Sequence, residues 1–294
     1  MKNSNKTTIR SDKELVNALR KAAEQGHAGA QCNLGCAYLD AEGVAQDDKQ
    51  AVFWWRKAAE QDHAGAQYNL GLAYYKGKGV KQDYKEAAKW YRKAAEQGDP
   101  GAQCNLGCAY HNGEGVKKDD KQAVMWLRKA ADQGLSNAQY SLGLAYYKGK
   151  GVKQDYKEAV NWYRKAADQG EPEAQCNLGC AYHEGDGVAQ DDKQAAFWWR
   201  KAADQGVAEA QNNLGNSYHE GWGVVKDAKE ALRWYHKAAD QGYAPAQYNL
   251  GEAYHFGWGF GKDDKEAMKW LTLAANQGFP PAQVILERAL KKKT

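Results

Sequence analysis

The chain has 294 residues, of which 43% are hydrophobic and 12% aromatic, a composition that excludes a disordered polymer and permits a sizeable core. Its 41 basic and 37 acidic residues give a net charge of +4, so the one-sided basic surface of a nucleic-acid binder is not expected. No apolar run reaches the roughly 18 residues of a membrane span, and residues 1–10 lack the apolar core of a signal peptide. We expect a cytoplasmic protein, but a secreted or periplasmic protein from which a leader had been removed would look the same.

The chain is built from an internal repeat. Residues 1–10 are predicted to form a disordered tail, and residues 291–294 form a short basic tail. Between them the dipeptide Ala-Gln recurs every 36 residues, with its alanine at 30, 66, 102, 138, 174, 210, 246 and 282. A half-unit covers residues 11–26, and another begins at residue 279. The seven full units predicted between them are 27–62, 63–98, 99–134, 135–170, 171–206, 207–242 and 243–278.

The first half of each unit predicts an amphipathic helix. In "PEAQCNLGCAYHEG", residues 172–185, the side chains of Ala174, Leu178 and Tyr182 share one face at helical spacing. Proline near the start leaves no N–H unsatisfied, and a G-x-G pair near the end supplies the positive φ that a helix stop requires.

The second half of each unit predicts another helix. It begins at an aspartate, at 47, 83, 119, 155, 191, 227 and 263, and the Gln or Glu three residues later predicts a reciprocal capping box. One column of this helix is tryptophan, which predicts a packing ridge: Trp54, Trp90, Trp126, Trp162, Trp198, Trp234 and Trp270. Because so short a helix pair cannot bury its own apolar stripe, neighbouring pairs must stack. The predicted fold is therefore all-α, a right-handed α-α superhelical solenoid that forms a single domain over residues 11–290.

The repeated pattern A-Q-x-x-L-G-x-x-Y-x-x-G-x-G-V, followed by D, A, W, K-A-A and Q-G, closely resembles the Sel-one-like repeat family of tetratricopeptide-like solenoids. The resemblance covers about residues 11–290, with departures at Ala41, Asp62 and Phe260. It implies an adaptor or scaffold that binds ligands along its concave face. We therefore expect a non-catalytic monomer that binds a protein or peptide, with no cofactor, no nucleic acid and no membrane insertion.

All six cysteines fall at i and i+4 on predicted first helices, in the pairs Cys32/Cys36, Cys104/Cys108 and Cys176/Cys180. A disulfide within such a pair is disfavoured, because helical i, i+4 Cβ atoms lie about 5–6 Å apart. The cysteine-rich branch of the resembled family has its thiols at positions that match Ala59 and Gln67 here, so its disulfide pattern is missing. A penicillin-binding or β-lactamase-like enzyme remains an alternative by family analogy alone.

A zinc-binding protein is a further alternative, since thiol and imidazole groups on one helix face can chelate one ion. The candidate ligands are Cys104, Cys108, His111, Cys176, Cys180 and His183. In the first unit, however, Leu39 replaces the histidine, and the sixth and seventh units keep histidine without cysteine. Because the residue types vary independently and no fourth ligand is evident, we expect no metal and interpret the cysteines as duplicated packing or groove-lining residues.

Alignment with tetratricopeptide repeats places one side of each first helix on the concave face. The predicted partner-binding residues are Tyr68, Tyr75, His111, Tyr140, Tyr147, His183, His219, Tyr248 and His255. The alternative is that half of this lining is buried between helices. Loop residues Trp222 and Trp258, with Phe256 and Phe260, predict either an exposed aromatic interaction patch or local packing under a loop.

Overall fold

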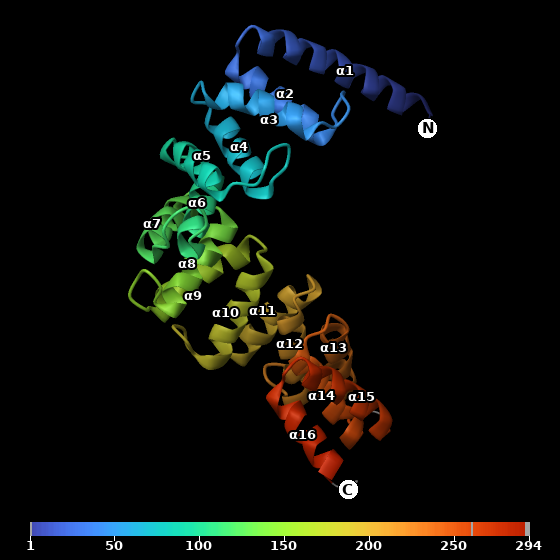
Figure 1. Ribbon diagram of the computed structural model, residues 1–294. Helices are drawn as coiled ribbons and strands as arrows, with labels where there is room; N and C mark the ends of the chain where they lie inside the picture. The colour runs from blue at the N-terminus through green and yellow to red at the C-terminus, as the bar shows by residue number, and fades with distance from the viewer. Residues whose placement is uncertain (1, 260, 292–294) are drawn as a thin grey trace. The chain divides into compact units, whose positions relative to one another are not determined.

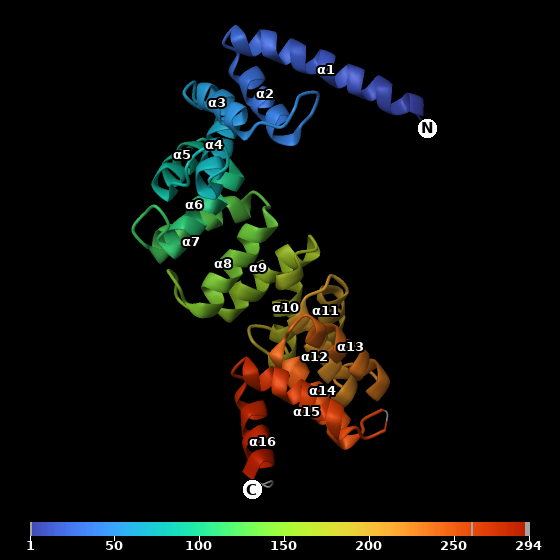
Figure 2. The ribbon, with the colours of Figure 1, turned by 45° about the vertical axis from the view of Figure 1, so that its right-hand side comes forward.

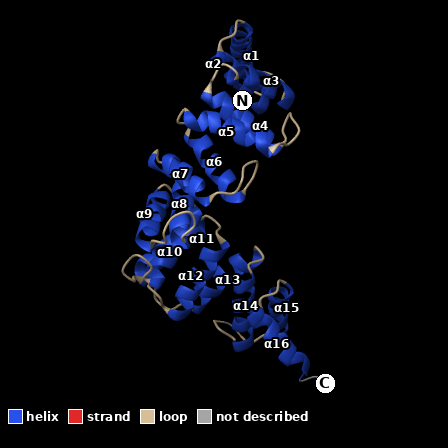
Figure 3. Cartoon of the chain, turned by 60° about the vertical axis from the view of Figure 1, so that its left-hand side comes forward, coloured by secondary structure: helices blue, strands red, loops and turns tan. Residues whose placement is uncertain are grey.

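The computed structural model describes the backbone of residues 2–259 and 261–291 and the side chains of residues 12–259 and 261–288. Over these ranges the chain forms sixteen helices and no strand (Figure 3), which confirms the predicted all-α repeat fold. The structure divides into two compact units, residues 1–154 and 155–294, where the sequence predicts one continuous domain. In a stack of repeats each repeat packs on its neighbours, so no single core has to extend through the whole chain.

The first unit contains helices α1 to α8 (Figure 1). They are α1 (Lys2–Glu24), α2 (Ala28–Asp40), α3 (Asp48–Ala59), α4 (Ala64–Lys76), α5 (Tyr84–Glu96), α6 (Pro100–Asn112), α7 (Asp120–Asp132) and α8 (Ser136–Lys148). Each helix packs mainly on the helices directly before and after it in the chain.

The second unit contains helices α9 to α16 and shows the same order of packing (Figure 2). They are α9 (Tyr156–Asp168), α10 (Pro172–Glu184), α11 (Asp192–Asp204), α12 (Ala208–Glu220), α13 (Ala228–Asp240), α14 (Ala244–Phe256), α15 (Asp264–Asn276) and α16 (Pro280–Lys291).

The N-terminal segment differs from the sequence prediction. Residues 2–10, expected to form a disordered tail, continue α1 as helix, because the stretch contains neither glycine nor proline to end it. At the other end, Lys291 is the last residue of α16, and the rest of the predicted basic tail, residues 292–294, lies outside the described residues.

The aspartate that starts each second helix caps it, but the reciprocal half of the predicted capping box is replaced by another bond. In α7 the carboxylate of Asp119 accepts from the backbone N–H groups of Lys121 and Gln122 at 3.0 and 3.1 Å. The N–H of Asp119 donates to the carbonyl of Tyr110 at 2.9 Å, not to the Gln122 side chain. Tyr110 lies in the last turn of α6, where carbonyl groups lack a partner within the helix.

The two helices of a repeat approach each other closely at the Leu-Gly motif. A Cβ atom on Gly179 of α10 would lie 2.6 Å from Cδ1 of Trp199 in α11, closer than real Cβ atoms come. Glycine therefore admits the large side chain of the second helix, and Trp199 is only 3% exposed.

The core consists of clusters between successive helices. One cluster of the first unit joins Trp55 of α3 and Leu70 of α4 with Trp90 of α5. In the second unit, Leu214 of α12 packs with Trp199 and with Trp234 of α13. The tryptophan column predicted as a packing ridge is buried throughout, since its seven members are 2% to 8% exposed.

Buried glutamines linked by hydrogen bonds form a ladder along the chain. This ladder accounts for the glutamines of the Ala-Gln and Gln-Gly motifs, which hydrophobic periodicity does not explain. The side-chain Nε2 of Gln103 donates to the carbonyl of Ala95 at 3.1 Å, and its Oε1 accepts from Gln133 at 2.8 Å. Each ladder step therefore joins the second helix of one repeat to both helices of the next. The same pairs of bonds are made by Gln31, Gln67, Gln175, Gln211 and Gln247.

Candidate functional site

The predicted partner-binding residues divide into two groups by burial. The predicted residues occupy two positions of each first helix, seven residues apart. The earlier position faces the next repeat: Tyr68, Tyr140 and Tyr248 are half-buried there, and the residues at the same position of other repeats, Cys32, Cys104, Cys176 and Asn212, are buried. Tyr68 shows why, because its ring reaches the backbone of Gly101 in the following first helix and Tyr91 in its own repeat. This position contributes to contacts between helices more than to a free surface.

The later of the two positions, near the end of each first helix, is more accessible to solvent. Tyr75 is 38% exposed and His255 is also exposed, while His111, Tyr147, His183 and His219 are half-buried at the ends of their helices. These side chains, together with the loop of the following repeat, make up what we call the first-helix rim.

Three rim histidines are bonded to the aspartate that directly follows the capping aspartate of the second helix in the same repeat. The distance from Nδ1 to Oδ1 is 2.7 Å in each of the pairs His111–Asp120, His183–Asp192 and His255–Asp264. The hydrogen bond from His255, with a smaller effect of Lys262, lowers the pKa of Asp264. These bonds fix the imidazole rings toward the aspartates, so the structure does not bring His111 or His183 to the cysteine thiols as the zinc alternative requires.

Two rim histidines also contact the tryptophan between the two loop glycines of the next repeat. The ring of Trp222 lies 4.5 Å from that of His183, and Trp258 stacks on His219 with centroids 4.2 Å apart and an interplanar angle of 29°. The loop tryptophans and the rim histidines, which the sequence places in separate groups, therefore form one surface. Phe256 is 62% exposed beside Trp258, whereas Phe260 lies outside the described residues.

Small clefts recur at equivalent positions along the rim. The cleft between α2, α3 and α4 has a volume of about 100 Å³ and is lined by Leu39, Asp48, Trp55, Asn69, Leu72 and Lys78, among others. The cleft between α6, α7 and α8, of about 160 Å³, is lined by the residues 72 positions later: His111, Asp120, Leu127, Ser141, Leu144 and Lys150. In the second unit, a cleft of about 410 Å³ between α14, α15 and α16 includes the matching positions His255, Asp264, Leu271, Ile285 and Arg288.

The cleft beside α3 contains an acceptor that the fold does not use. Oδ1 of Asp48 is buried and has no hydrogen-bond partner among the described residues. The equivalent oxygens of Asp120, Asp192 and Asp264 accept from the rim histidines, but the first repeat has Leu39 in place of histidine. A buried oxygen without a partner costs free energy, so a donor brought by a ligand would be favoured there.

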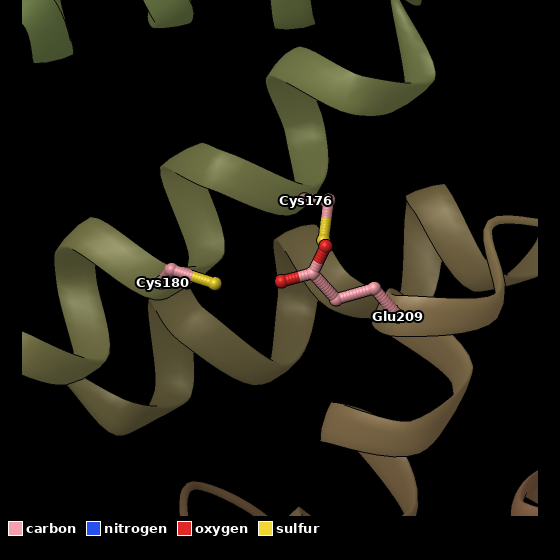
Figure 4. Close-up of side chains that lie close together, drawn as sticks. All are labelled: Cys176, Cys180 and Glu209. Carbon is pink, nitrogen blue, oxygen red and sulfur yellow. The ribbon is translucent and has the colours of Figure 1, made fainter. Parts of the chain in front are cut away.

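None of the six cysteines, all of which lie in the described ranges, takes part in a disulfide. In the fifth repeat a hydrogen bond between the thiols raises the pKa of Cys176 and lowers that of Cys180, while burial raises both. Among the described residues, this is the pair whose two sulfur atoms lie within 4.8 Å of each other and of a carboxylate oxygen, that of Glu209 (Figure 4). The sequence analysis did not identify Glu209, which lies 33 residues after Cys176. The residues 33 positions after Cys32 and Cys104 are Gly65 and Asn137, neither of which is an acid.

Comparison with known proteins follows the same 36-residue division. Sel1 repeats match residues 19–27, 28–63, 64–99, 100–135, 136–171, 172–207, 208–243 and 244–279, each full repeat beginning one residue later than in the predicted units. The chain belongs to the Sel1 repeat family. Proteins of this family are generally protein-interaction scaffolds and are typically not enzymes.

Solved structures show similar proteins in bacteria. A protective antigen of uropathogenic Escherichia coli with an SLR fold is 40% identical, with a TM-score of 0.85 and coverage of 95% of this chain and 60% of that one. This Sel1 repeat chain therefore spans about 60% of the length of that relative. A Sel1 repeat protein from Oxalobacter formigenes is 36% identical, with a TM-score of 0.72 and coverage of 96% and 81%. No curated protein matches the chain.

Across the described residues, no helix combines the length and apolar character that crossing a bilayer requires.

Proposed function

We propose that this Sel1 repeat protein is a non-catalytic scaffold that binds an extended segment of a partner protein along the first-helix rim. In a repeat solenoid the first helices line the concave side, which offers successive equivalent contacts to one ligand. The observation that carries the proposal is the recurrence of the rim cleft at positions 72 residues apart in the first unit, with the same kinds of residue in its lining.

The lining of these clefts indicates the chemistry of the partner. Each is lined by a leucine, Leu72 or Leu144, together with an aspartate and lysine residues. Apolar side chains of the partner at regular spacing would pack on the leucines, while its polar groups would meet the charged residues. In the first cleft the buried oxygen of Asp48 favours a lysine or arginine of the partner, because either supplies a charged donor.

The second unit offers aromatic contacts in the same positions. The pairs His183–Trp222 and His219–Trp258 present ring surfaces that suit aromatic, proline or arginine side chains. Such large, rigid side chains commonly contribute most of the binding free energy at protein interfaces.

The proposal is tested by affinity capture from a native lysate with three forms of the full chain, followed by quantitative mass spectrometry. The rim variant carries Tyr75→Ser, Tyr147→Ser and His183→Ser. The matched control variant carries Phe53→Ser, Met125→Ser and Phe197→Ser, which remove exposed apolar side chains from second helices. Circular dichroism establishes that all three forms are folded.

A partner retained by the wild type and the control but lost from the rim variant is the expected result. If the rim variant keeps the partner and the second-helix control loses it, the binding surface lies on the other helices. If all three forms capture the same partners equally, neither surface is involved and the proposed rim is wrong.

A further inference from the structure

The cluster of Cys176, Cys180 and Glu209 lies outside the rim clefts and joins two successive repeats of the second unit. Both cysteines belong to α10, one turn apart, and Glu209 belongs to the first turn of α12. Figure 4 shows the Glu209 carboxylate extending toward the sulfur atoms from the neighbouring helix. Two thiols and a carboxylate, all of which are ligand types found at zinc sites, therefore converge from two elements.

The distances suit one cation. The three ligand atoms lie within 4.8 Å of one another, whereas two thiolates bound to one zinc ion at about 2.3 Å are about 3.8 Å apart. Small side-chain rotations close this difference, and Glu209 is free to make them because it is exposed. Cys176, in contrast, is only 1% exposed, so its sulfur is held in place by the packing around it.

The surroundings support the cluster. The side-chain amide of Asn213, one turn along α12 from Glu209, lies 3.7 Å from the sulfur of Cys180 and can donate to a thiolate there. Donors of this kind orient ligands and are commonly needed for tight metal binding.

We propose that Cys176, Cys180 and Glu209 bind a thiophilic divalent cation such as Zn²⁺, with the fourth tetrahedral position open to water. Binding replaces the two thiol protons, which pass to solvent, so the affinity rises with pH. The bound ion links α10 to α12 and thereby adds a bond between the fifth and sixth repeats.

The same chain contains matched control sites. Gly65 in the second repeat and Asn137 in the fourth occupy the position that Glu209 has in the sixth, although each follows a repeat with the same pair of cysteines. Two cysteines without a carboxylate at this position therefore occur twice, and two cysteines with one occur once.

The experiment titrates the metal-free full chain with Zn²⁺ and with Co²⁺, whose thiolate charge-transfer absorption reports cysteine ligation. The background form carries serine at Cys32, Cys36, Cys104 and Cys108, so that only the proposed site keeps its thiols. We expect this form to bind one ion per chain with the thiolate absorption, and Glu209→Gln to weaken binding by about 10- to 100-fold. No thiolate absorption, or equal affinity in the Glu209→Gln form, overturns the proposal.

A gain-of-site variant tests the role of the carboxylate at a second cysteine pair. In a chain that keeps Cys104 and Cys108 but has serine at the other four cysteines, Asn137→Glu places an acid at the matching position. Thiolate-ligated Co²⁺ binding at least about tenfold tighter than in the same chain with Asn137 supports the assignment. Equal binding by the two chains shows that a carboxylate at this position does not complete a site and overturns it.

Discussion

Ala41 adopts a left-handed backbone conformation with φ of 58°, at the position where later repeats have glycine. Asp62 does the same with φ of 60° at the other glycine position that the first repeat lacks. A side chain with a Cβ atom is strained in this conformation by roughly 1–2 kcal/mol. Both departures from the repeat pattern therefore weaken the first repeat in a way that single substitutions can reverse.

Ala41→Gly is expected to stabilise the protein by about 1 kcal/mol, because glycine adopts the left-handed region without steric cost. The matched control is Gly77→Ala at the same position of the second repeat, where φ is 68° and a Cβ would lie 3.1 Å from that of Gln82. This change should destabilise by at least as much. Urea denaturation midpoints measure both, and a lower midpoint for Ala41→Gly contradicts the expectation.

His236 interrupts a second residue pattern. Six arginines donate to the tyrosine hydroxyl 18 residues later, as Arg164 does to Tyr182 at 2.7 Å, but in the sixth repeat His236 faces Tyr254 at 3.4 Å. Burial lowers the pKa of His236 below its ordinary value, against the opposing effects of Asp240 and Glu266. Below about pH 6.5, His236 is therefore protonated more readily in the unfolded chain than in the folded chain. The free energy of unfolding consequently falls as the pH decreases.

His236→Arg should restore the bond to the hydroxyl of Tyr254 and remove this pH dependence. We expect its melting temperature to exceed that of the wild type by more at pH 5 than at pH 8. The other histidines are common to both proteins, so the difference between their melting curves isolates His236. A difference that is the same at both pH values would show that proton binding by His236 does not affect stability.

At the scale of helices, the glutamine ladder adds hydrogen bonds between successive helices that are otherwise held together by apolar packing. Gln103 of α6 is 4% exposed; it donates to the carbonyl of Ala95, in the last turn of the preceding helix, and accepts from the side chain of Gln133. Ala95 also accepts from the N–H of Gly98, and Gln133 also donates to the carbonyl of Gly98. Loss of the Gln103 amide would therefore remove two hydrogen bonds, each worth about 0.5–1.5 kcal/mol, without leaving either partner unpaired.

Gln103→Met keeps the volume of the side chain but removes both hydrogen bonds, and should destabilise the protein by about 1–3 kcal/mol. The control is Gln190→Met, at an exposed loop position, which should change stability by less than about 0.5 kcal/mol. Chemical denaturation of the full chain measures both. Equal midpoints for the two variants would show that the ladder adds no stability.

The helices could be predicted from the sequence because their signals are local. Asp119 and Pro100 mark helix starts, and the spacing of Leu178 and Tyr182 marks a face, all within a few residues. The partners of the candidate site could not, because they depend on how far each repeat is shifted against the next. Trp222 covers His183, and Glu209 reaches Cys176, across 39 and 33 residues, a register that the period of 36 alone does not define.

At the scale of the whole molecule, the chain behaves as a series of similar interfaces. Within each unit the main contacts join helices that follow one another, so each repeat is stabilised by its neighbours. Residues 71–87 and 143–159 have the same sequence, "GLAYYKGKGVKQDYKEA". Two repeats can therefore be removed with a junction that is identical to one already present.

Deletion of residues 71–142 joins Leu70 directly to Gly143 and recreates the natural sequence through the next seventeen residues. We expect this shorter protein to fold with the same helical content per residue, because every helix at the junction meets side chains of the type it meets in the full chain. Its denaturation midpoint should be lower, since fewer interfaces between repeats remain. Deletion of residues 71–88, half a repeat, is the control and should abolish cooperative unfolding, because it sets second-helix side chains against the wrong partners. Loss of helical signal from the 71–142 deletion would show instead that the repeats depend on contacts beyond their neighbours.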